Sequence, residues 1–499
     1  MPRIPLLGVY NSRIGAISAS SASSGIVGIG IVGVMIVGGT PSTDRDQRFI
    51  NCYPLTVKNQ VARTATPYLV KRAGFQASTT PSAGNAGTGL KVWVGNSNKI
   101  ISAFGTTNST IYDGTSSLGA ITGKCTGITE TILSGTANIA VSADNNRAWF
   151  YPAGGALTEI TDGDFPGQAG RTVVGTFAHL EGYAFIMDST GRIYNSDINS
   201  LSAWTANAFA STNVVPDSGI GCVEYRNHIL AFGSRSMEVW YNAGNPSGSP
   251  LSRRDEATRL IGLINYHAIT KIVDMLAFVG TSNLGALEVY LMDGFEPRRI
   301  STPEIESQLT LMGVNDVYVS AKKEAGRTFI VVSGPATTYV YCVEEQLWHE
   351  WSSQTPLWQF MDGIASGSSY VTYAVSALST SGKVYSVNPA GFTYQDDGVA
   401  YTATFQLSQY DGGSSDRKIM PSLRVVGDRA GSTSTLSISF SDDDYATWST
   451  VRTVDLSTER PELKKINGSF VRRAVKGTHS ANLAMRLEAL ETDVRKASR

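Results

Sequence analysis

Cysteine and histidine are scarce in this 499-residue chain. The four cysteines stand far apart and form no CxxC pair: Cys52, Cys125, Cys222 and Cys342. The five histidines occur singly, outside any H-x-H or HExxH pattern: His179, His228, His267, His349 and His479. Zinc sites and disulfide frameworks need closer, paired spacings. We therefore expect no metal site, and cysteines that behave as small buried hydrophobes in a reducing compartment.

Charge is also low. Only 17% of the residues are charged, and the net charge is −1. Proteins that bind nucleic acid tightly use Lys and Arg to displace condensed counterions, and such proteins are clearly basic. The near-zero net charge therefore argues against a protein that binds DNA tightly.

The chain has no apolar run that suits a membrane helix. The candidate, Gly25–Gly39, is 15 residues long and is interrupted by glycines, whereas a membrane-spanning helix needs about 20 apolar residues. The start, Met1–Pro5, lacks the hydrophobic region of a signal peptide. We expect a soluble protein that is not exported by that route.

What the chain has in abundance is turn and strand residues. It contains 50 glycines, 21 tyrosines and 8 tryptophans. Glycine favours tight turns, and aromatic side chains suit pleated, half-buried surfaces. The length allows about two to four domains. These features predict an all-β fold.

A two-strand unit recurs from residue 91 to residue 390. An apolar strand is followed by a strand in which an aliphatic residue or Ala precedes an aromatic one. The aromatics of the seven units are Tyr112, Trp149, Tyr194, Trp240, Tyr290, Tyr341 and Tyr385. Their spacing, 37 to 51 residues, is typical of a β-propeller with one four-stranded blade per repeat. We predict six, possibly seven, blades with these aromatics packed between them. Separate β-sandwiches with chance spacing are the less favoured alternative.

The pattern changes on either side of the repeats. Residues 1–80 indicate an extended N-terminal arm with a Gly- and Ser-rich insert at 16–43, and residues 81–395 form the predicted propeller. Strict alternation in residues 396–499 predicts a β-sandwich-like domain. Its end, residues 451–499, holds 11 Lys and Arg against 6 Asp and Glu. Such a face is usually only solvated, and contact with a partner subunit or DNA is the alternative.

An enzyme is not indicated. Ser441–Trp448 resembles the Asp box of sialidases, but it occurs once, outside the repeats, and in sialidases this box is a structural turn. Adjacent carboxylates such as Asp255-Glu256 point to opposite faces of a strand, although glycoside hydrolysis needs two at a defined separation. No G-x-S-x-G or Walker loop occurs, and the GxGxxG match at Gly28–Gly33 lacks the strand–helix context. We expect no catalytic residue and no cofactor.

Two segments carry a family resemblance. The first is an F-G-x-x-S-x-E-x-W strand, and the second an R-I-S-T-x-x-I-E segment. The residues that carry the two motifs are Phe232, Gly233, Ser236, Glu238, Trp240, Arg299, Ile300, Ser301, Thr302 and Glu306. With Ser196-Asp197 before Trp204, Pro2–Gly8 and Asn51–Pro54, they resemble the packaged-DNA stabilisation proteins of short-tailed phages, also called tail hub or nozzle proteins. The insert at 16–43 departs from that family.

The resemblance implies a structural virion protein. It would form a homo-hexameric ring in the phage tail, below the portal and adaptor, and would be assembled in the host cytoplasm. The ring would extend the DNA channel, retain the packaged genome and permit its ejection, with a tail fibre or tailspike and a needle or plug as partners. Double-stranded DNA would pass non-specifically, which a near-neutral charge permits, and no small-molecule substrate is implied. We further expect Gly25–Gly39 to pack between subunits.

Two alternatives remain open. A propeller that binds or degrades glycans would have a pocket where carboxylates and aromatics converge. A propeller scaffold unrelated to phage would be a monomer that forms no ring.

Overall fold

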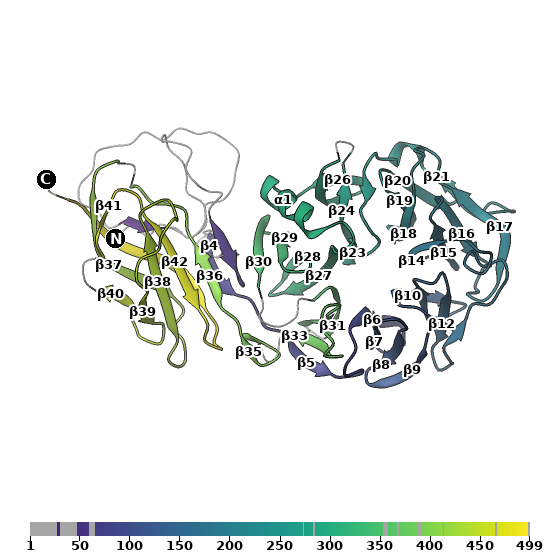
Figure 1. The fold of residues 1–499 in the computed structure, drawn as a ribbon, viewed down its shortest axis with the longest axis horizontal. Helices are drawn as coiled ribbons and strands as arrows, with labels where there is room; N and C mark the ends of the chain where they lie inside the picture. Colours follow the sequence, from purple (N-terminus) through teal and green to yellow (C-terminus); the bar gives the residue numbers. More distant parts are fainter. Residues whose placement is uncertain are drawn as a thin grey trace. The chain divides into compact units, whose positions relative to one another are not determined.

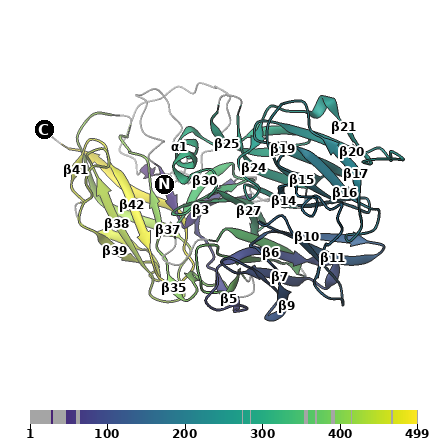
Figure 2. The same cartoon turned by 45° about the vertical axis from the view of Figure 1, so that its right-hand side comes forward.

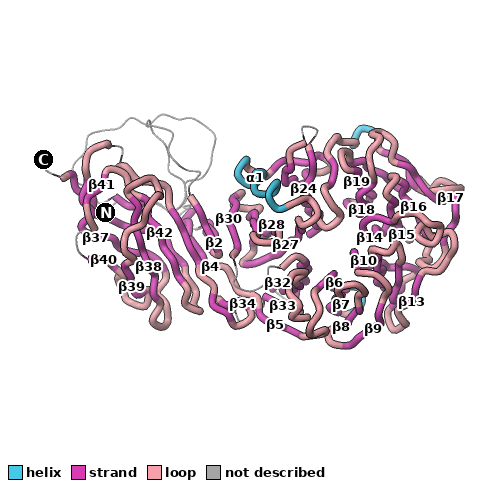
Figure 3. Tube along the Cα trace, viewed as in Figure 1, coloured by secondary structure: helices cyan, strands magenta, loops and turns pink. Residues whose placement is uncertain are grey.

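The computed structural model describes residues 27–29, 47–58, 65–272, 274–282, 285–352, 358–366, 369–387, 392–412, 414–464 and 467–497. These residues are nearly all strand and loop (Figure 3), and one α-helix, α1 (Pro303–Met312), occurs among them. The expected all-β fold is confirmed. The chain divides into two compact units. The propeller unit comprises Phe75–Val343 and Pro356–Gly391, and the sandwich unit comprises Met1–Gly74, Glu344–Thr355 and Phe392–Arg499.

The propeller unit consists of seven antiparallel sheets that follow one another along the chain. The first three sheets contain β6 (Gly87–Trp93), β7 (Lys99–Phe104), β8 (Thr110–Asp113) and β9 (Ser116–Ala120); β10 (Cys125–Leu133), β11 (Thr136–Ala143), β12 (Ala148–Pro152) and β13 (Thr158–Glu159); and β14 (Val173–Leu180), β15 (Tyr183–Asp188), β16 (Arg192–Ser196) and β17 (Trp204–Ser211). The next two contain β18 (Gly219–Tyr225), β19 (His228–Gly233), β20 (Met237–Asn242) and β21 (Leu251–Arg253); and β22 (Gly262–Leu263), β23 (Ile269–Ile272), β24 (Met275–Thr281), β25 (Leu287–Asp293) and β26 (Glu296–Arg299). The last two contain β27 (Tyr318–Glu324), β28 (Arg327–Ser333) and β29 (Thr338–Cys342); and β31 (Phe360–Ser366), β32 (Ser369–Val375), β33 (Val384–Val387) and β5 (Gln76–Thr79).

The seven sheets close into a ring (Figure 1). Strands β6, β10, β14 and β18 contact one another in that order, as do β23, β27 and β31, and β31 contacts β6 again. The last sheet is completed by β5, which comes from the N-terminal side of the unit and pairs with β33. This is a β-propeller. Six sheets have four or five strands within the unit and the seventh, β27–β29, has three, which meets the expectation of six, possibly seven, blades.

Short turns set the register of the blades. Four of the turns between the first and second strands of a blade place both central residues at positive φ: Ser134-Gly135, Glu181-Gly182, Arg226-Asn227 and Ala325-Gly326. Two-residue turns of this kind match the right-handed twist of the strands that they join. Each hairpin therefore keeps its apolar residues on the faces that pack against neighbouring blades.

The seven repeat aromatics all lie on the strand that is third in order across its blade, namely on β8, β12, β16, β20, β25, β29 and β33. All are buried except Tyr112, which is half-buried. Trp149 packs with residues of the first blade, Tyr194 with the second and Trp240 with the third. Tyr112 packs against Phe104 and residues of the last blade. In these four cases the aromatic fills the space toward the preceding blade.

The sandwich unit has two main sheets, seen from a second direction in Figure 2. One runs in the order β3 (Cys52–Lys58), β4 (Ala65–Lys71), β43 (Arg486–Lys496), β37 (Lys418–Gly427) and β40 (Glu462–Lys464), with β1 (Val27–Ile29) on β43 and β41 (Ser469–Phe470) on β37. The other contains, within this unit, β30 (Leu347–Trp351), β2 (Arg48–Ile50), β36 (Ala403–Gln406), β42 (Ala474–His479), β38 (Thr435–Ser441) and β39 (Arg452–Asp455). A short hairpin contains β34 (Gln395–Asp396) and β35 (Val399–Ala400). Buried residues of both sheets, such as Leu423 and Phe405, share one core, as expected for a sandwich.

The N-terminal segment differs from the extended arm that the sequence suggested. Its described residues include β3 and β4, which pair with each other, and β4 also pairs with β43 near the other end of the chain. Pairing across some 400 residues leaves no local pattern in a sequence, so these strands could not be assigned to the C-terminal sheet in advance. Of the insert at 16–43, only Val27–Ile29 is described, as a strand paired with β43, and the rest lies outside the described residues.

A buried ion pair joins distant segments of the sandwich unit. The guanidinium of Arg72 donates two hydrogen bonds to the Asp396 carboxylate, at 3.0 and 2.5 Å, and a third to Asn51 Oδ1 at 2.9 Å. Both charged side chains are almost fully buried. The Tyr401 ring lies 4.0 Å from the guanidinium carbon, and its hydroxyl donates to the Arg72 carbonyl. The pair is thus satisfied on every side, as a buried charge must be.

We expect Trp240→Ala to destabilise the propeller unit by about 3–5 kcal/mol, because it leaves a cavity between two blades. The matched control is Tyr241→Ala, since Tyr241 is the next residue of β20 and 42% exposed. That change should lower the free energy of unfolding by less than about 1 kcal/mol. The midpoints of thermal unfolding compare the two variants, and equal midpoints would contradict the packing role.

Asp396→Asn should destabilise the sandwich unit by about 3–5 kcal/mol, because it leaves the Arg72 charge buried without its counter-ion. The double variant Arg72→Met, Asp396→Leu should recover much of that loss, since no charge then remains buried. Asp397→Asn is the control, as this half-buried neighbour has a positive φ that Asn tolerates. Urea unfolding followed by tryptophan fluorescence measures all three, and no recovery in the double variant would show that the pair is not the cause.

Candidate functional site

The first family motif forms the hairpin between β19 and β20. Phe232 is buried, and its ring lies 5.2 Å from that of Phe278 in the next blade. The Asp217 carboxylate accepts hydrogen bonds from the Arg235 amide at 2.7 Å and from the Ser236 hydroxyl at 3.1 Å. A Cβ on Gly233 would stand 2.3 Å from this carboxylate, so only glycine fits beside it. Sequence reasoning missed Asp217, because its link to the hairpin is tertiary.

Glu238 of the same motif holds the connection between two blades. Its side chain is 1% exposed. One carboxylate oxygen accepts the amide hydrogens of Asn213 and Val214, both at 3.0 Å, in the segment that leads into β18. The other oxygen is 3.6 Å from an Arg253 guanidinium nitrogen. Because a buried carboxylate must be compensated, this network makes Glu238 a structural anchor of the connection.

The second motif fastens α1 to the fifth blade. Arg299 forms ion pairs with Glu288 at 3.3 Å and with Glu306 at 2.7 Å. The Ser301 hydroxyl donates to Glu306 at 2.7 Å and accepts the Val289 amide hydrogen at 3.1 Å. Two backbone bonds complete the joint: Ile300 N–H donates to the Val289 carbonyl at 2.9 Å, and Glu306 N–H to that of Thr302 at 3.0 Å.

The predicted site residues therefore do not meet in one pocket. The hairpin group and the helix group lie on different blades and share no bond among those described, and Trp240 belongs both to the hairpin motif and to the packing aromatics. The residues of each group connect one backbone segment to another, or one blade to its neighbour.

An aromatic cluster, which the sequence did not single out, links the segment before β23 to the sixth and seventh blades. It comprises Tyr266 and His267, from the segment between β22 and β23, together with Tyr318 and Phe360. The His267 ring centre is 4.8 Å from that of Tyr318 in the sixth blade and 5.4 Å from that of Phe360 in the seventh. A Cβ on Gly175, in the third blade, would lie 3.8 Å from Tyr266 Cβ.

Two consecutive residues, whose Cα atoms are about 3.8 Å apart, thus reach blades on both sides of their own. Burial, with the charge of Lys124 as a smaller cause, lowers the pKa of His267 to about 3, so its ring is neutral.

Other reactive groups have structural surroundings. Among the described residues no group of three or more His, Cys, Asp or Glu is placed to hold a metal ion. The four cysteines are buried and form no disulfide, and burial raises the pKa of Cys125 and of Cys222 to about 12, so these thiols stay protonated. In the segment that resembles an Asp box, the Asp443 carboxylate accepts from Ser441 and from Thr447 within one turn. No helix in the described part of the chain is long and apolar enough to cross a membrane.

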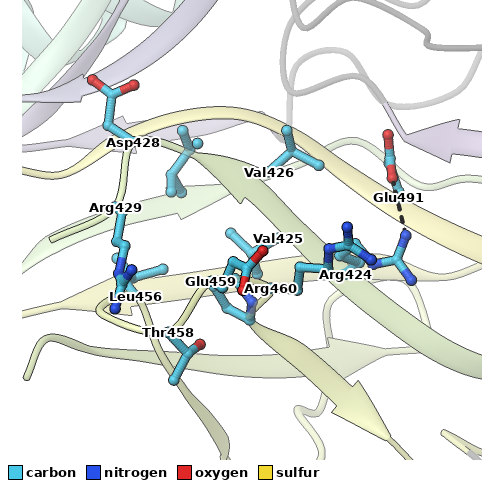
Figure 4. A pocket seen from close by; sticks show the side chains of 13 residues that line it. Arg424, Val425, Val426, Asp428, Arg429, Leu456, Thr458, Glu459, Arg460 and Glu491 are labelled. Carbon is cyan, nitrogen blue, oxygen red and sulfur yellow. Dashed lines mark ion pairs between the residues drawn. The ribbon is translucent and has the colours of Figure 1, made fainter.

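A groove of about 430 Å³ lies beside β37 in the sandwich unit (Figure 4). Its charged lining residues are Arg424, Asp428, Arg429, Glu459, Arg460 and Glu491. Arg424 points toward Glu491, 3.8 Å away (Figure 4). Arg429 donates to the Ser457 carbonyl at 2.6 Å. Three basic and three acidic side chains balance, so the groove has no net charge to select a ligand.

The chain is similar to the solved structure of BamB from Moraxella catarrhalis, with 8% identity, a TM-score of 0.38, and coverage of 71% of this chain and 97% of BamB. It is also similar to the computationally designed Ika8 protein, with 10% identity, a TM-score of 0.39, and coverage of 62% and 99%. No curated protein matches it by sequence. The family model described as "Bacteriophage P22 Gp10, beta-propeller" matches residues 32–410, most of the chain. The chain therefore belongs to the P22 Gp10-like family of phage DNA-stabilisation proteins.

Proposed function

We propose that the protein is the hub of a phage tail, a homo-hexameric ring below the portal and adaptor that extends the DNA channel. In this role it retains the packaged genome and later permits its ejection. The observation that carries the proposal is the family match over residues 32–410, which spans the propeller unit and reaches into the sandwich unit.

In the proposed ring the DNA channel lies between the subunits. Identical subunits that repeat one heterologous contact around an axis enclose such a central opening. The six propellers would then form the wall of the channel.

The mechanism is steric and mechanical. The hydrogen bonds of Asp217, the buried Glu238 carboxylate and the buried Arg72–Asp396 pair favour a wall that keeps its shape while DNA is held behind it. The adaptor would bind one end of the ring, a needle or plug would seal the other, and a tail fibre or tailspike would attach to the outside. The protein would be assembled in the host cytoplasm and remain in the virion.

A glycan-binding or glycan-degrading role has less support. The pocket among the third, fourth and fifth blades is lined by residues such as Gly175, Cys222, Phe232 and Lys271, with no carboxylate in its lining. A glycosidase needs two carboxylates flanking the scissile bond.

The purified full-length protein, mixed with its adaptor ring, should form particles with six copies of the 53.3 kDa chain and sixfold symmetry. Mass photometry measures the stoichiometry, and negative-stain microscopy the symmetry. A protein that stays monomeric with and without the adaptor would refute the hub.

Deleting Gly25–Gly39 should impair ring assembly and leave the propeller unit folded. This run supplies β1, which pairs with β43, and its other residues are rich in glycine and aliphatic side chains. Mass photometry reports assembly, and the thermal midpoint reports folding. Replacing the same residues with a Gly/Ser segment of equal length is the control for linker length. Normal rings from both variants would disprove the role of this run.

A further inference from the structure

A basic edge lies at one end of the sandwich unit, although the chain as a whole has a net charge of −1. It is formed where the start of β37, the residues after β41 and the end of β43 come together. Its members are Arg417, Lys418, Arg472, Arg495 and Lys496. Lys418 pairs in register with Lys496 on one side and with Phe470 on the other, which brings the three segments side by side.

The edge is held together by a buried lysine. The Lys418 ammonium donates to three backbone carbonyls: Ser414 at 2.5 Å, Asp416 at 2.9 Å and Val471 at 3.0 Å. Ala497 N–H also donates to the Arg417 carbonyl at 2.9 Å. These bonds fix the backbone from which the other four basic side chains project.

Those four side chains face solvent. Arg417, Arg472 and Arg495 are exposed, and 76% of the Lys496 side chain is accessible. Two acidic groups act on this edge: Asp416 pairs with Lys496 at 2.7 Å, and the charge of Asp411 acts on Lys418. The solvent-facing guanidinium groups of Arg417 and Arg472 add to the positive charge of the edge.

The groove beside β37 provides a contrast within the same unit. There the lining holds three basic and three acidic side chains, and no net charge results. The basic edge therefore does not reflect a general excess of Lys and Arg over the unit. It is a local surplus that an anionic surface of matching charge would neutralise.

We propose that this basic edge contacts the phosphate backbone of double-stranded DNA in the tail channel. The inference rests on the proposed function, since it assigns to that channel the surface that touches DNA. Each phosphate contact releases condensed counterions, so binding is independent of sequence and weakens steeply with salt. Only a few contacts per subunit are available, which suits a ring that slows DNA and still lets it slide.

The test uses the full-length protein and a fluorescent DNA duplex of random sequence. Fluorescence anisotropy gives the Kd at several salt concentrations, and the slope of log K against log salt counts the phosphate contacts. The variant Arg417→Glu, Arg472→Glu removes two of the exposed charges. The control Arg171→Glu, Arg298→Glu changes the net charge equally, at two exposed positions of the propeller unit.

We expect the slope of the edge variant to fall in magnitude by about two, while the control keeps the wild-type slope. Equal losses in both variants would overturn the proposal, because the effect would then reflect net charge alone. Absence of DNA binding by the wild type at 50 mM salt would also overturn it. So would an edge variant that binds DNA normally but no longer joins the adaptor ring, since the edge would then contact protein.

Thermal midpoints and mass photometry accompany each measurement. The proposal is supported if the edge variant is folded and still forms rings, but its salt slope shows the loss of two phosphate contacts. If the wild type forms no ring, the hub itself fails, and this outcome is separate from the DNA result.

Discussion

The closure of the propeller ring by strand β5 is the constraint on which the rest of that unit depends. Each blade exposes apolar faces to both neighbours, so an open row would leave two faces and one incomplete sheet in water. Pairing of Gln76–Thr79 with Val384–Val387 completes the last sheet and fastens the two ends of the unit's chain to each other. Contact of β31 with β6 then buries the faces that remain.

Closure also brings side chains of different blades into contact. Once seven inner strands face one axis, the short segment between β22 and β23 can meet blades on both sides through its aromatic rings. The surface that we propose for DNA contact lies elsewhere, on the basic edge of the sandwich unit.

Local patterns made much of the fold predictable. The aliphatic–aromatic repeat marks the third strand of every blade, because one side chain of that shape fills the same space each time. The two motifs lie on the elements that their patterns indicate. Their partners were not predictable, since Asp217 meets the β19–β20 hairpin, and Asn213 meets Glu238, only after the blades have folded. The family-signature residues and the packing aromatics hold the blades and their connections in place. The contribution of each residue to stability is a prediction.

The sequence by itself determined the all-β class, the propeller, the sandwich-like second region and the family. Periodicity and motifs are properties of short stretches of sequence, so they can be recognised without the structure. Tertiary structure alone decided which strands complete which sheet. It placed β3 and β4 with β43, buried Arg72 against Asp396, and gathered five basic residues from three segments into one edge. Such groupings depend on backbone pairing between distant segments, and that pairing leaves no periodic signal in the sequence.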